Sequence, residues 1–426
     1  MSTTVANVQS WLKTQFGPPI EILPEENTLA SDIGFIPAEK QTGDKYRRPV
    51  RLQNEHGFTY NSDHSAFALL TAKDAVAEHA ELEGAEIAGV ANISYGIAAK
   101  MARSKGGDAR AYKQGVGELI EGLMLGGEIR REIALWYGPG STGLANLGVV
   151  NAVVSAVATT LVVNVTRATW AAGMWNMLIG AGFDFHTAAG VSHAANAEFV
   201  LAGVNPTNCR LTFTGNAADV ASVLAADVIT FRASRTVSCV GMQPILENTG
   251  ALFGIDASVY PQWKALQYAV GGPLTFDKVV EGCAAASENG LSDGGNLYVG
   301  ARAWTDLMTD EASLRRHVGD KSSKSAKTGY GELEFESLCG AIKIKTHRYL
   351  KQGIAAFIPT QYCERVGAQD LSFSVPGNKN QWFWRELDGF AGSQIRLYGD
   401  QAVLNTQPNK SVLFTGISST SDAIPA

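Results

Sequence analysis

Two glycine-rich segments have the spacing of known chemical motifs. Residues 138–143, GPGSTG, fit the dinucleotide-binding pattern G-x-G-x-x-G, and residues 290–294, GLSDG, fit the nucleophile elbow G-x-S-x-G. The first segment follows an expected helix instead of a strand, and no acidic residue stands about 20 positions later to bind a ribose. The second lies between an expected helix and an expected strand, the reverse of an elbow. We interpret both as chance matches.

Histidine and cysteine spacing gives no metal site. The seven histidines, at positions 56, 64, 79, 186, 193, 317 and 347, include no H-E-x-x-H pair. His79 and Glu81 match the start of a deaminase zinc motif, but its P-C-x-x-C partner is missing. The odd number of cysteines without C-x-x-C spacing indicates reduced thiols in a cytosolic chain. These cysteines are Cys209, Cys239, Cys283, Cys339 and Cys363. We therefore assign no catalytic, cofactor-binding or metal-ligating residue, and we expect a protein that is not an enzyme.

Composition favours a globular chain of two or three domains. The 426 residues are 45% hydrophobic and 18% charged, so a large core is available and few charges cover the surface. The net charge of −6, from 35 basic and 41 acidic residues, argues against a protein that wraps nucleic acid electrostatically. Residues 1–15 have no apolar run behind a basic start, so we expect no secretion signal.

One apolar segment has the length of a membrane span. Residues 137–183 contain the single charge Arg167, and Leu147–Val165 would cross a bilayer as a helix. The segment is interrupted by glycine, asparagine, serine and threonine and is rich in β-branched residues. It therefore predicts a buried strand and no contact with a membrane.

The first hundred residues predict an arm followed by a projecting loop. Residues 1–45 contain early prolines and little periodicity. Tyr46–Gln53 alternates between two faces, and Pro49 restricts this strand to a sheet edge. A second alternating run, Glu86–Tyr95, comes back after the polar residues 54–85. We expect these two runs to form a long two-stranded loop, which is marginal alone and needs a neighbour.

Three helices are expected further along the chain. Asp108–Trp136 has apolar residues at 3/4 spacing, Asp108 as a plausible N-cap and Gly138 after its end. At ~1.5 Å per residue this helix is about 40 Å long. Residues 157–270 alternate short apolar runs with turn residues and predict a β-rich region. The remaining expected elements are helices over Thr275–Glu288 and Ala303–His317, and a strand over Asn296–Val299.

Residues 332–346 predict a hairpin with its turn at Cys339 and Gly340. Pairing across this turn places Glu336 opposite Lys343, Glu334 opposite Lys345 and Phe335 opposite Ile344. On that register, replacing Phe335 by Asp should cost more stability than replacing Glu336 by Gln.

An ordered succession of segments is similar to bacteriophage capsid proteins of the Hong Kong 97 type. The most distinctive is Val240–Gly250, VGMQPILENTG, which continues through Leu252–Asp256 to Tyr260–Trp263. Further similar segments are Gly272–Asp277, Trp304, Gly340–Arg365, Ile395–Asp400, Tyr46–Tyr60 and the helix over Asp108–Trp136. Each motif alone is moderately specific, and the resemblance covers nearly the whole chain.

The resemblance implies an α+β fold with the four parts of that family. These are an N-terminal arm (1–45), an extended loop (46–100), a peripheral domain with a long spine helix (101–165, completed after 270) and an axial domain (mainly 166–270). Residues 271–426 supply the remainder of the peripheral and axial domains.

The resemblance also implies the major capsid protein of a tailed phage. Such subunits form hexamers and pentamers that close into an icosahedral shell around double-stranded DNA, which this acidic chain would contact only non-specifically. The implied partners are other copies of the chain, a separate scaffolding protein, a portal and a decoration protein. The implied location is the virion, after assembly in the bacterial host cytoplasm. Two alternatives stay open, an encapsulin-like nanocompartment and an intracellular hydrolase that uses scattered residues.

Some members of the family cross-link neighbouring subunits through a lysine, an asparagine and a glutamate. Lys73 lies in the expected loop, and Asn405 or Asn409 lies in the other region. No local motif supports the match, so we name no cross-linking residue.

Overall fold

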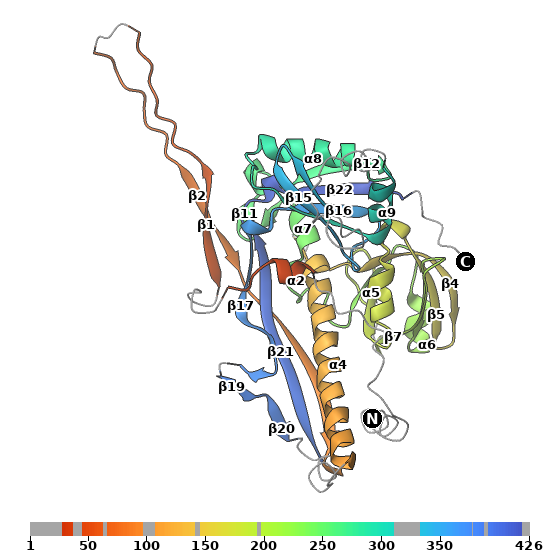
Figure 1. Ribbon diagram of the computed structural model, residues 1–426. Helices are drawn as coiled ribbons and strands as arrows, with labels where there is room; N and C mark the ends of the chain where they lie inside the picture. Colours follow the sequence, from red (N-terminus) through yellow and green to blue (C-terminus); the bar gives the residue numbers. More distant parts are fainter. Residues whose placement is uncertain are drawn as a thin grey trace, which may run out of the picture.

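The computed structural model describes most of the chain. The described residues are 28–36, 45–62, 66–96, 107–140, 145–193, 197–310, 333–376, 378–386 and 391–419, with the side chains of 28, 107–116, 333–336 and 378–382 left aside. Figure 1 shows an elongated body, a barrel at its side and a two-stranded loop that projects from it.

Helix α4 (Gly107–Tyr137) confirms the expected long helix and runs along one side of the body (Figure 1). It starts one residue before Asp108, so Asp108 lies inside the helix and the expectation of an N-cap there is wrong. The helix packs on an elongated sheet of four strands. These are β3 (Ala85–Ser94), β17 (Cys363–Ser372), β20 (Trp384–Glu386) and β21 (Gly392–Asn405).

Close approach of helix and sheet depends on glycine. A Cβ atom on Gly127 of α4 would lie 2.4 Å from a methyl carbon of Leu397, and one on Gly89 would lie 3.1 Å from Leu123. Leu397 and Gly89 are register partners on β21 and β3 and therefore share the sheet face toward α4.

A six-stranded sheet with helix α8 forms the second layer of the body. Its strand order is β12-β22-β16-β13-β15-β14, with β13 parallel to β15 and antiparallel to β16. Helix α8 (Phe276–Glu288) confirms the expected second helix and packs Val279 and Cys283 on this sheet. The strands are β12 (Leu266–Gly272), β13 (Gly295–Val299), β14 (Leu333–Ser337), β15 (Gly340–Thr346), β16 (Ile354–Ile358) and β22 (Val412–Ile417).

Helix α9 (Ala301–Thr309) is shorter than the helix expected over Ala303–His317. Residue 310 is already extended, and residues 311–317 lie outside the described residues. Short elements complete this part of the body. They are α7 (Met242–Glu247), β10 (Ala251–Leu252), β11 (Ile255–Asp256), β18 (Ser374–Val375), β19 (Asn378–Trp382) and the 3₁₀ turns η3 (Pro261–Trp263), η4 (Thr360–Tyr362) and η5 (Pro408–Lys410).

The β-rich region expected over 157–270 contains five of the six strands of a closed barrel. The remaining barrel strand, β4, precedes this region and ends at Val157. Leu147–Val165, expected as one buried strand, forms the hairpin β4–β5 instead, so these residues belong with the barrel and not with the spine helix. Within the described residues, no helix combines the length and the apolar character needed to cross a membrane. The barrel strands are β4 (Gly148–Val157), β5 (Thr160–Val165), β6 (Gly182–His186), β7 (Phe199–Asn205), β8 (Arg210–Thr214) and β9 (Val228–Phe231), with η2 (Arg167–Thr169), α5 (Ala172–Met177) and α6 (Ala217–Ser222) beside them.

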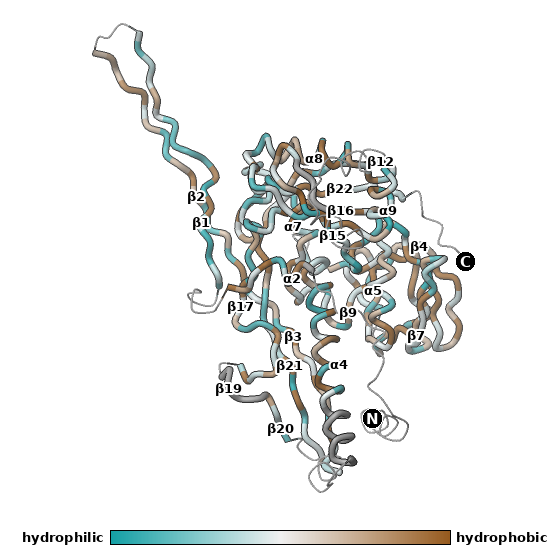
Figure 2. Tube along the Cα trace, viewed as in Figure 1, coloured by the Kyte–Doolittle hydropathy of each residue, from teal (hydrophilic) through white to brown (hydrophobic). Residues whose placement is uncertain are grey.

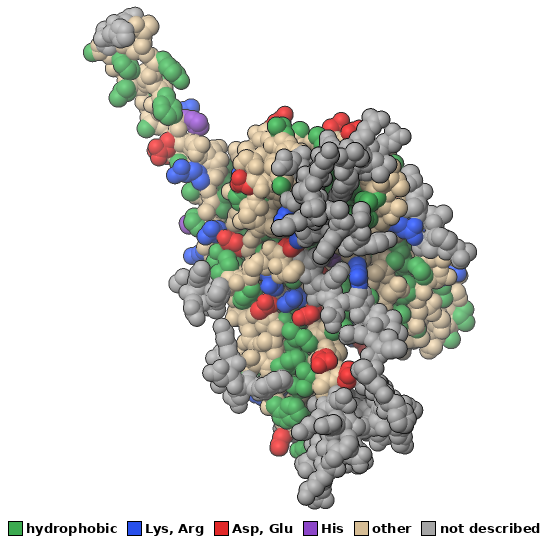
Figure 3. Space-filling model, in the orientation of Figure 1, with side chains coloured by type: hydrophobic (Ala, Val, Ile, Leu, Met, Phe, Trp, Pro, Cys, Tyr) green, Lys and Arg blue, Asp and Glu red, His purple; other side chains and the backbone are tan. Residues whose placement is uncertain are grey.

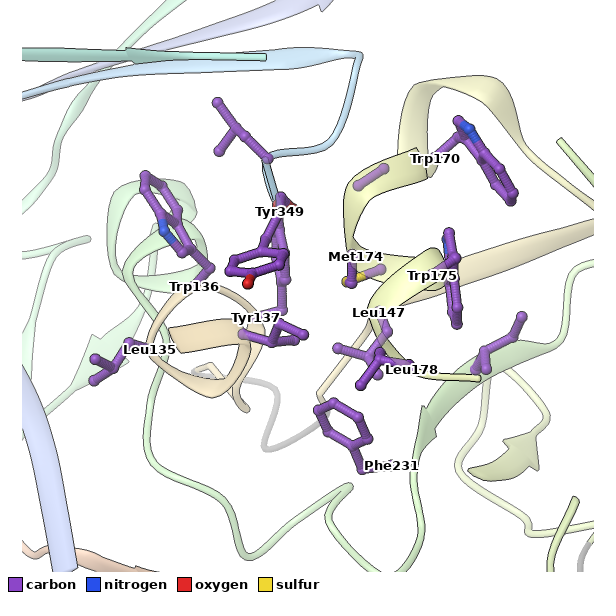
Figure 4. Close-up of a cluster of buried hydrophobic side chains, with 14 of the residues drawn as sticks. Leu135, Trp136, Tyr137, Leu147, Trp170, Met174, Trp175, Leu178, Phe231 and Tyr349 are labelled. Atoms are coloured by element: carbon purple, nitrogen blue, oxygen red, sulfur yellow. The ribbon is translucent and has the colours of Figure 1, made fainter. Parts of the chain in front are cut away.

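Aromatic side chains join the barrel to the spine helix. Phe183 and Phe213 stack edge to face inside the barrel, and Trp175 lies beside Phe183. Figure 4 shows Trp136 and Tyr137, at the end of α4, facing Tyr349 across from Met174 and Trp175. Because these side chains are all fully or nearly fully buried, the barrel and helix share one continuous core.

The expected projecting loop exists, but its second strand is different. Strand β1 (Tyr46–Gln53) has the predicted bounds and pairs with β2 (Val76–Leu82) in a two-stranded sheet, which agrees with an edge position for Pro49. Strand β3, expected to return along the loop, pairs with β21 in the elongated sheet. The alternation of β3 arises because one of its faces packs on α4, and not because it belongs to a hairpin with β1.

The expected hairpin at 332–346 is present with a shifted register. Strand β14 sets Glu334 opposite Lys343 and Phe335 opposite Ile342, so the turn is Leu338-Cys339 and the predicted pairs are wrong. Cys339 is fully buried, while Leu338 is 75% exposed. Burial of this thiol and the parallel pairing of β15 with β13 outweigh the charge match that favoured the predicted register. The side chain of Phe335 lies outside the described residues.

Gly340 offers a test of this turn. Its φ is +98°, and a Cβ atom there would lie 2.6 Å from the amide nitrogen of Gly294. Gly340→Ala should therefore lower the free energy of unfolding by roughly 2 kcal/mol, since both strain and a clash are added. Gly250→Ala is the matched control, because nothing lies within 4 Å of its Cβ position and no positive φ is required. Urea unfolding of both variants measures the difference, and equal losses would contradict the turn.

Candidate functional site

The base of the projecting loop is firmly attached to the body. Ala80 and Leu82 of β2 and Leu52 of β1 are buried in a cluster with Trp263 and Leu404. The amide of Glu81 donates to the carbonyl oxygen of Phe253 at 2.9 Å. Polar bonds add to this anchoring, because Tyr46 donates to Glu364 at 2.9 Å and Arg48 lies 3.2 Å from the same carboxylate. Strand β2 thus belongs to a core, although residues 54–85 were expected to form a polar segment of the projecting loop.

Beyond the base, the two legs of the loop contact each other and extend into solvent. The amide of His56 donates to the carbonyl oxygen of Lys73 at 3.0 Å, and the amide of Leu70 donates to the hydroxyl of Thr59 at 2.9 Å. Figure 1 shows the legs leading away from every other element. We call residues 54–75 the loop tip.

The loop tip exposes large apolar side chains. Figure 3 shows hydrophobic atoms gathered along this projection, and Figure 2 shows apolar positions on both of its legs. The exposed fractions are 73% for Phe58, 94% for Tyr60, 49% for Phe67, 80% for Leu69 and 66% for Leu70. Single exposed apolar residues are normal on a protein surface, but five on one thin projection form a surface suited to contact with another chain.

A second candidate site is the N-terminal segment 28–36, which lies across the spine helix. Glu132 of α4 is fully buried and accepts hydrogen bonds from the amides of Leu29 (2.8 Å) and Ala30 (3.0 Å). Its carboxylate also lies 2.8 Å from Nε2 of the buried His347. Burial alone raises the pKa of Glu132, but His347 and the two amides outweigh it and hold this pKa below its ordinary value.

Further contacts extend this attachment to both sheets. Asp32, in α2 (Thr28–Asp32), accepts hydrogen bonds from Lys345 at 2.6 Å and from Tyr298 at 2.5 Å, both on the six-stranded sheet. Arg365 of β17 donates to the carbonyl oxygen of Ile33 at 2.9 Å. Segment 28–36 therefore links the spine helix to two sheets through charged groups.

A buried lysine lies where the spine helix ends. The Lys351 ammonium donates to the carbonyl oxygen of Asn146 at 2.8 Å and lies 4.2 Å from the centre of the Tyr137 ring. Desolvation lowers the pKa of Lys351 to about 7, while Glu247 acts in the opposite direction. The Asn146 carbonyl oxygen and the Tyr137 ring face both attract a cation, so Lys351 links Asn146, just before the barrel, to the end of the spine helix.

The described residues of the two motif-like glycine segments lie between the elements that the sequence analysis expected. Residues 138–140 follow helix α4, and residues 290–294 lie between α8 and β13, as the motif interpretation required. His79 is exposed on β2, and Glu81 forms an ion pair with Arg47 at 2.8 Å. Among the described residues, no group of three or more histidine, cysteine, aspartate or glutamate side chains could hold a metal ion.

The residues considered for a cross-link have different surroundings. Lys73 is exposed on the loop tip. Asn405 is 1% exposed, and its side chain is bonded to Ser411 and to the amide of Gln407, so it is closed to another chain. Asn409 lies near the surface beside a cavity of about 470 Å³ that is also lined by Arg48 and Lys410.

Sequence reasoning missed the polar groups of segment 28–36 and its partners. One signal was available, because Glu132 falls on the same apolar stripe of α4 as Ile129, Ile133 and Trp136. A charge on a buried stripe requires a partner. That partner, His347, is 215 residues away in the chain, and no local sequence pattern identifies it.

Several solved structures have a fold similar to that of this chain. A chain of the cyanophage A-1(L) capsid asymmetric unit matches with a TM-score of 0.54 at 10% sequence identity, over 95% of this chain and 96% of that chain. A capsid chain of the native GTA particle matches with a TM-score of 0.44 at 6% identity, over 95% of each chain. A chain of the SrpI encapsulin complex from Synechococcus elongatus matches with a TM-score of 0.38 at 9% identity, over 99% of this chain and 98% of that chain.

No protein-family model matches the sequence, and no curated protein matches it. At 10% identity the cyanophage match concerns the fold alone, and the two lower scores add no support. The mixed α and β fold of this chain is thus that of a phage capsid protein.

Proposed function

We propose that the chain is the major capsid protein of a tailed bacteriophage with the Hong Kong 97-like fold. The observation that carries the proposal is the match of nearly the whole chain to a cyanophage capsid chain. The projecting loop supports it, because a tip with five exposed apolar side chains suits a protein that completes its structure on a neighbour.

The proposed domains follow from this fold. Residues 1–45 are the N-terminal arm, and the extended loop begins at Tyr46. Helix α4 with the elongated sheet would form the peripheral domain, and the barrel with its neighbours the axial domain. Because β3 pairs with β21, we restrict the extended loop to residues 46–82 and assign β3 to the peripheral domain.

Self-assembly through the loop tip is the proposed mechanism. Each tip would pack its apolar side chains against another copy, within hexamers and pentamers that close into an icosahedral shell. An individual contact is worth only a few kcal/mol, on the order of one or two buried apolar side chains. A closed shell repeats this contact many times, and such multivalency makes the particle stable.

The other proposed partners and the location follow from this role. They are a scaffolding protein, a portal and a decoration protein, with assembly in the bacterial host cytoplasm and residence in the virion of a member of the Caudoviricetes. Packaged double-stranded DNA would be contacted non-specifically, because the net charge is −6. We propose no catalytic activity.

Electron microscopy of the purified protein tests this function. We expect closed icosahedral particles, and particles isolated from infected cells should contain double-stranded DNA and a portal. Particles filled with an enzyme would support the encapsulin-like alternative instead. A chain that stays a monomer at every concentration, with and without candidate scaffolding protein, would contradict a shell subunit.

A further inference from the structure

Two of the five cysteines lie against each other at one edge of the six-stranded sheet. Cys283 is on helix α8, and Cys339 is in the turn between β14 and β15. The Cys339 thiol donates to the carbonyl oxygen of Cys283 at 2.9 Å, and the two thiols are also hydrogen-bonded to each other. Both side chains are fully buried. The contact joins residues that are 56 positions apart in the chain.

The two thiols differ in their acidity. The hydrogen bond from Cys283 holds the pKa of Cys339 below the ordinary value of a thiol, and the same bond raises the pKa of Cys283. Elsewhere burial raises the pKa of Cys239 and of Cys363 to about 12. The thiolate is the reactive form of cysteine, so Cys339 is the more reactive member of the pair and has a second thiol beside it.

A small reagent needs only a local opening to reach this pair. Cys339 directly follows the 75% exposed Leu338 in the turn, so an opening of this turn would expose the thiol. Strand β14 is at the edge of the sheet and pairs with β15 alone in the described part of the chain. Edge hairpins of this kind open more readily than central strands.

We propose that Cys283 and Cys339 are a redox site that forms a reversible disulfide with a small peroxide as oxidant. The Cys339 thiolate attacks one peroxide oxygen, the O–O bond breaks, and Cys339 becomes a sulfenic acid as water leaves after protonation. The Cys283 sulfur then attacks the Cys339 sulfur, the S–O bond breaks, and a second water leaves. Two thiols lose two electrons and two protons, and one peroxide is reduced to two waters.

The disulfide would fasten helix α8 to the β14–β15 hairpin. A covalent link across this separation restricts the unfolded chain, so the oxidised protein should melt several degrees higher than the reduced protein. This inference does not depend on the proposed capsid function, because it rests on the thiol geometry alone.

The test is a thiol count on the purified full-length protein. After treatment with hydrogen peroxide near pH 7.5, quenching and denaturation, we expect the five thiols to fall to three, and dithiothreitol should restore five. Peptide mass spectrometry without reductant should show the Cys283 peptide linked to the Cys339 peptide. The rate of disulfide formation should increase with pH, because the thiolate is the attacking form.

Single variants provide the controls. Cys339→Ser should keep all four remaining thiols, whereas Cys239→Ser should still lose two. Persistence of five thiols in the wild type, a link between other cysteines, or oxidation of Cys339 to a sulfinic acid without pairing would each overturn the proposal. The peptide map of the wild type decides the matter even if a variant does not fold.

Discussion

Replacing the loop tip, residues 54–75, by a short Gly-Ser turn is expected to leave a folded subunit that no longer closes into shells. The tip has exposed apolar side chains and contacts mainly itself, so its removal should change the free energy of unfolding by less than about 1 kcal/mol. The deletion spares β2, because Ala80 and Leu82 belong to a buried cluster. Thermal melting measures folding, and sedimentation with electron microscopy measures assembly.

A point variant separates chemistry from loop length. Tyr60→Ser combined with Leu69→Ser keeps the loop but removes apolar surface, and should shift the protein from particles toward capsomers and monomers. Val259→Ser is the matched control, since Val259 is 62% exposed on the body. Normal particles from the truncated protein would show that the tip is not the contact between subunits. Failure of that protein to fold would show that the tip belongs to a core.

Glu132→Gln is expected to cause the largest loss of stability of any single substitution considered. Removing the charge of a fully buried, hydrogen-bonded carboxylate leaves its partners unmatched and typically costs about 3–5 kcal/mol. The amides of Leu29 and Ala30 donate to the two different oxygens of Glu132, so the glutamine would turn an NH₂ group toward one of these donors. Urea unfolding at pH 7 measures the loss. Protection of the Leu29 and Ala30 amides from hydrogen exchange should fall in parallel.

The same variant should change the pH dependence of stability. The pKa of Glu132 is lower in the folded protein than its ordinary value of 4.5, so the carboxylate stabilises the fold above about pH 4.5. This contribution is lost as the pH falls through the folded-state pKa. The difference in unfolding free energy between wild type and Glu132→Gln should therefore narrow in acid.

Glu121→Gln, on an exposed position of the same helix, is the control and should stay within about 0.5 kcal/mol of the wild type. If Glu132→Gln lowers the free energy of unfolding at pH 7 as little as the control does, the attachment of segment 28–36 does not depend on Glu132. A difference that widens in acid would contradict the direction of the pKa shift.

The sequence by itself determined the elements whose pattern depends on near neighbours in the chain. The apolar stripe of α4 and the alternation of β1 are set by burial of one face, and their bounds were predicted to within about one residue. A projecting segment was expected over the polar residues 54–85, and the projection is present, but its exposed apolar side chains were not expected. The ordered segments similar to capsid proteins predicted the fold class that the structural match supports.

Only the tertiary structure decided which strands pair and which buried polar groups meet. Backbone hydrogen bonds are alike for every strand, so alternation identifies the buried face of β3 but not its partner β21. The hairpin register depended on burial of Cys339 and on the parallel strand β13, which no local charge pattern reveals. The partners Glu132 and His347, and likewise Cys283 and Cys339, are distant in sequence. They meet because packing of the whole chain brings them together, and that packing leaves no local signature.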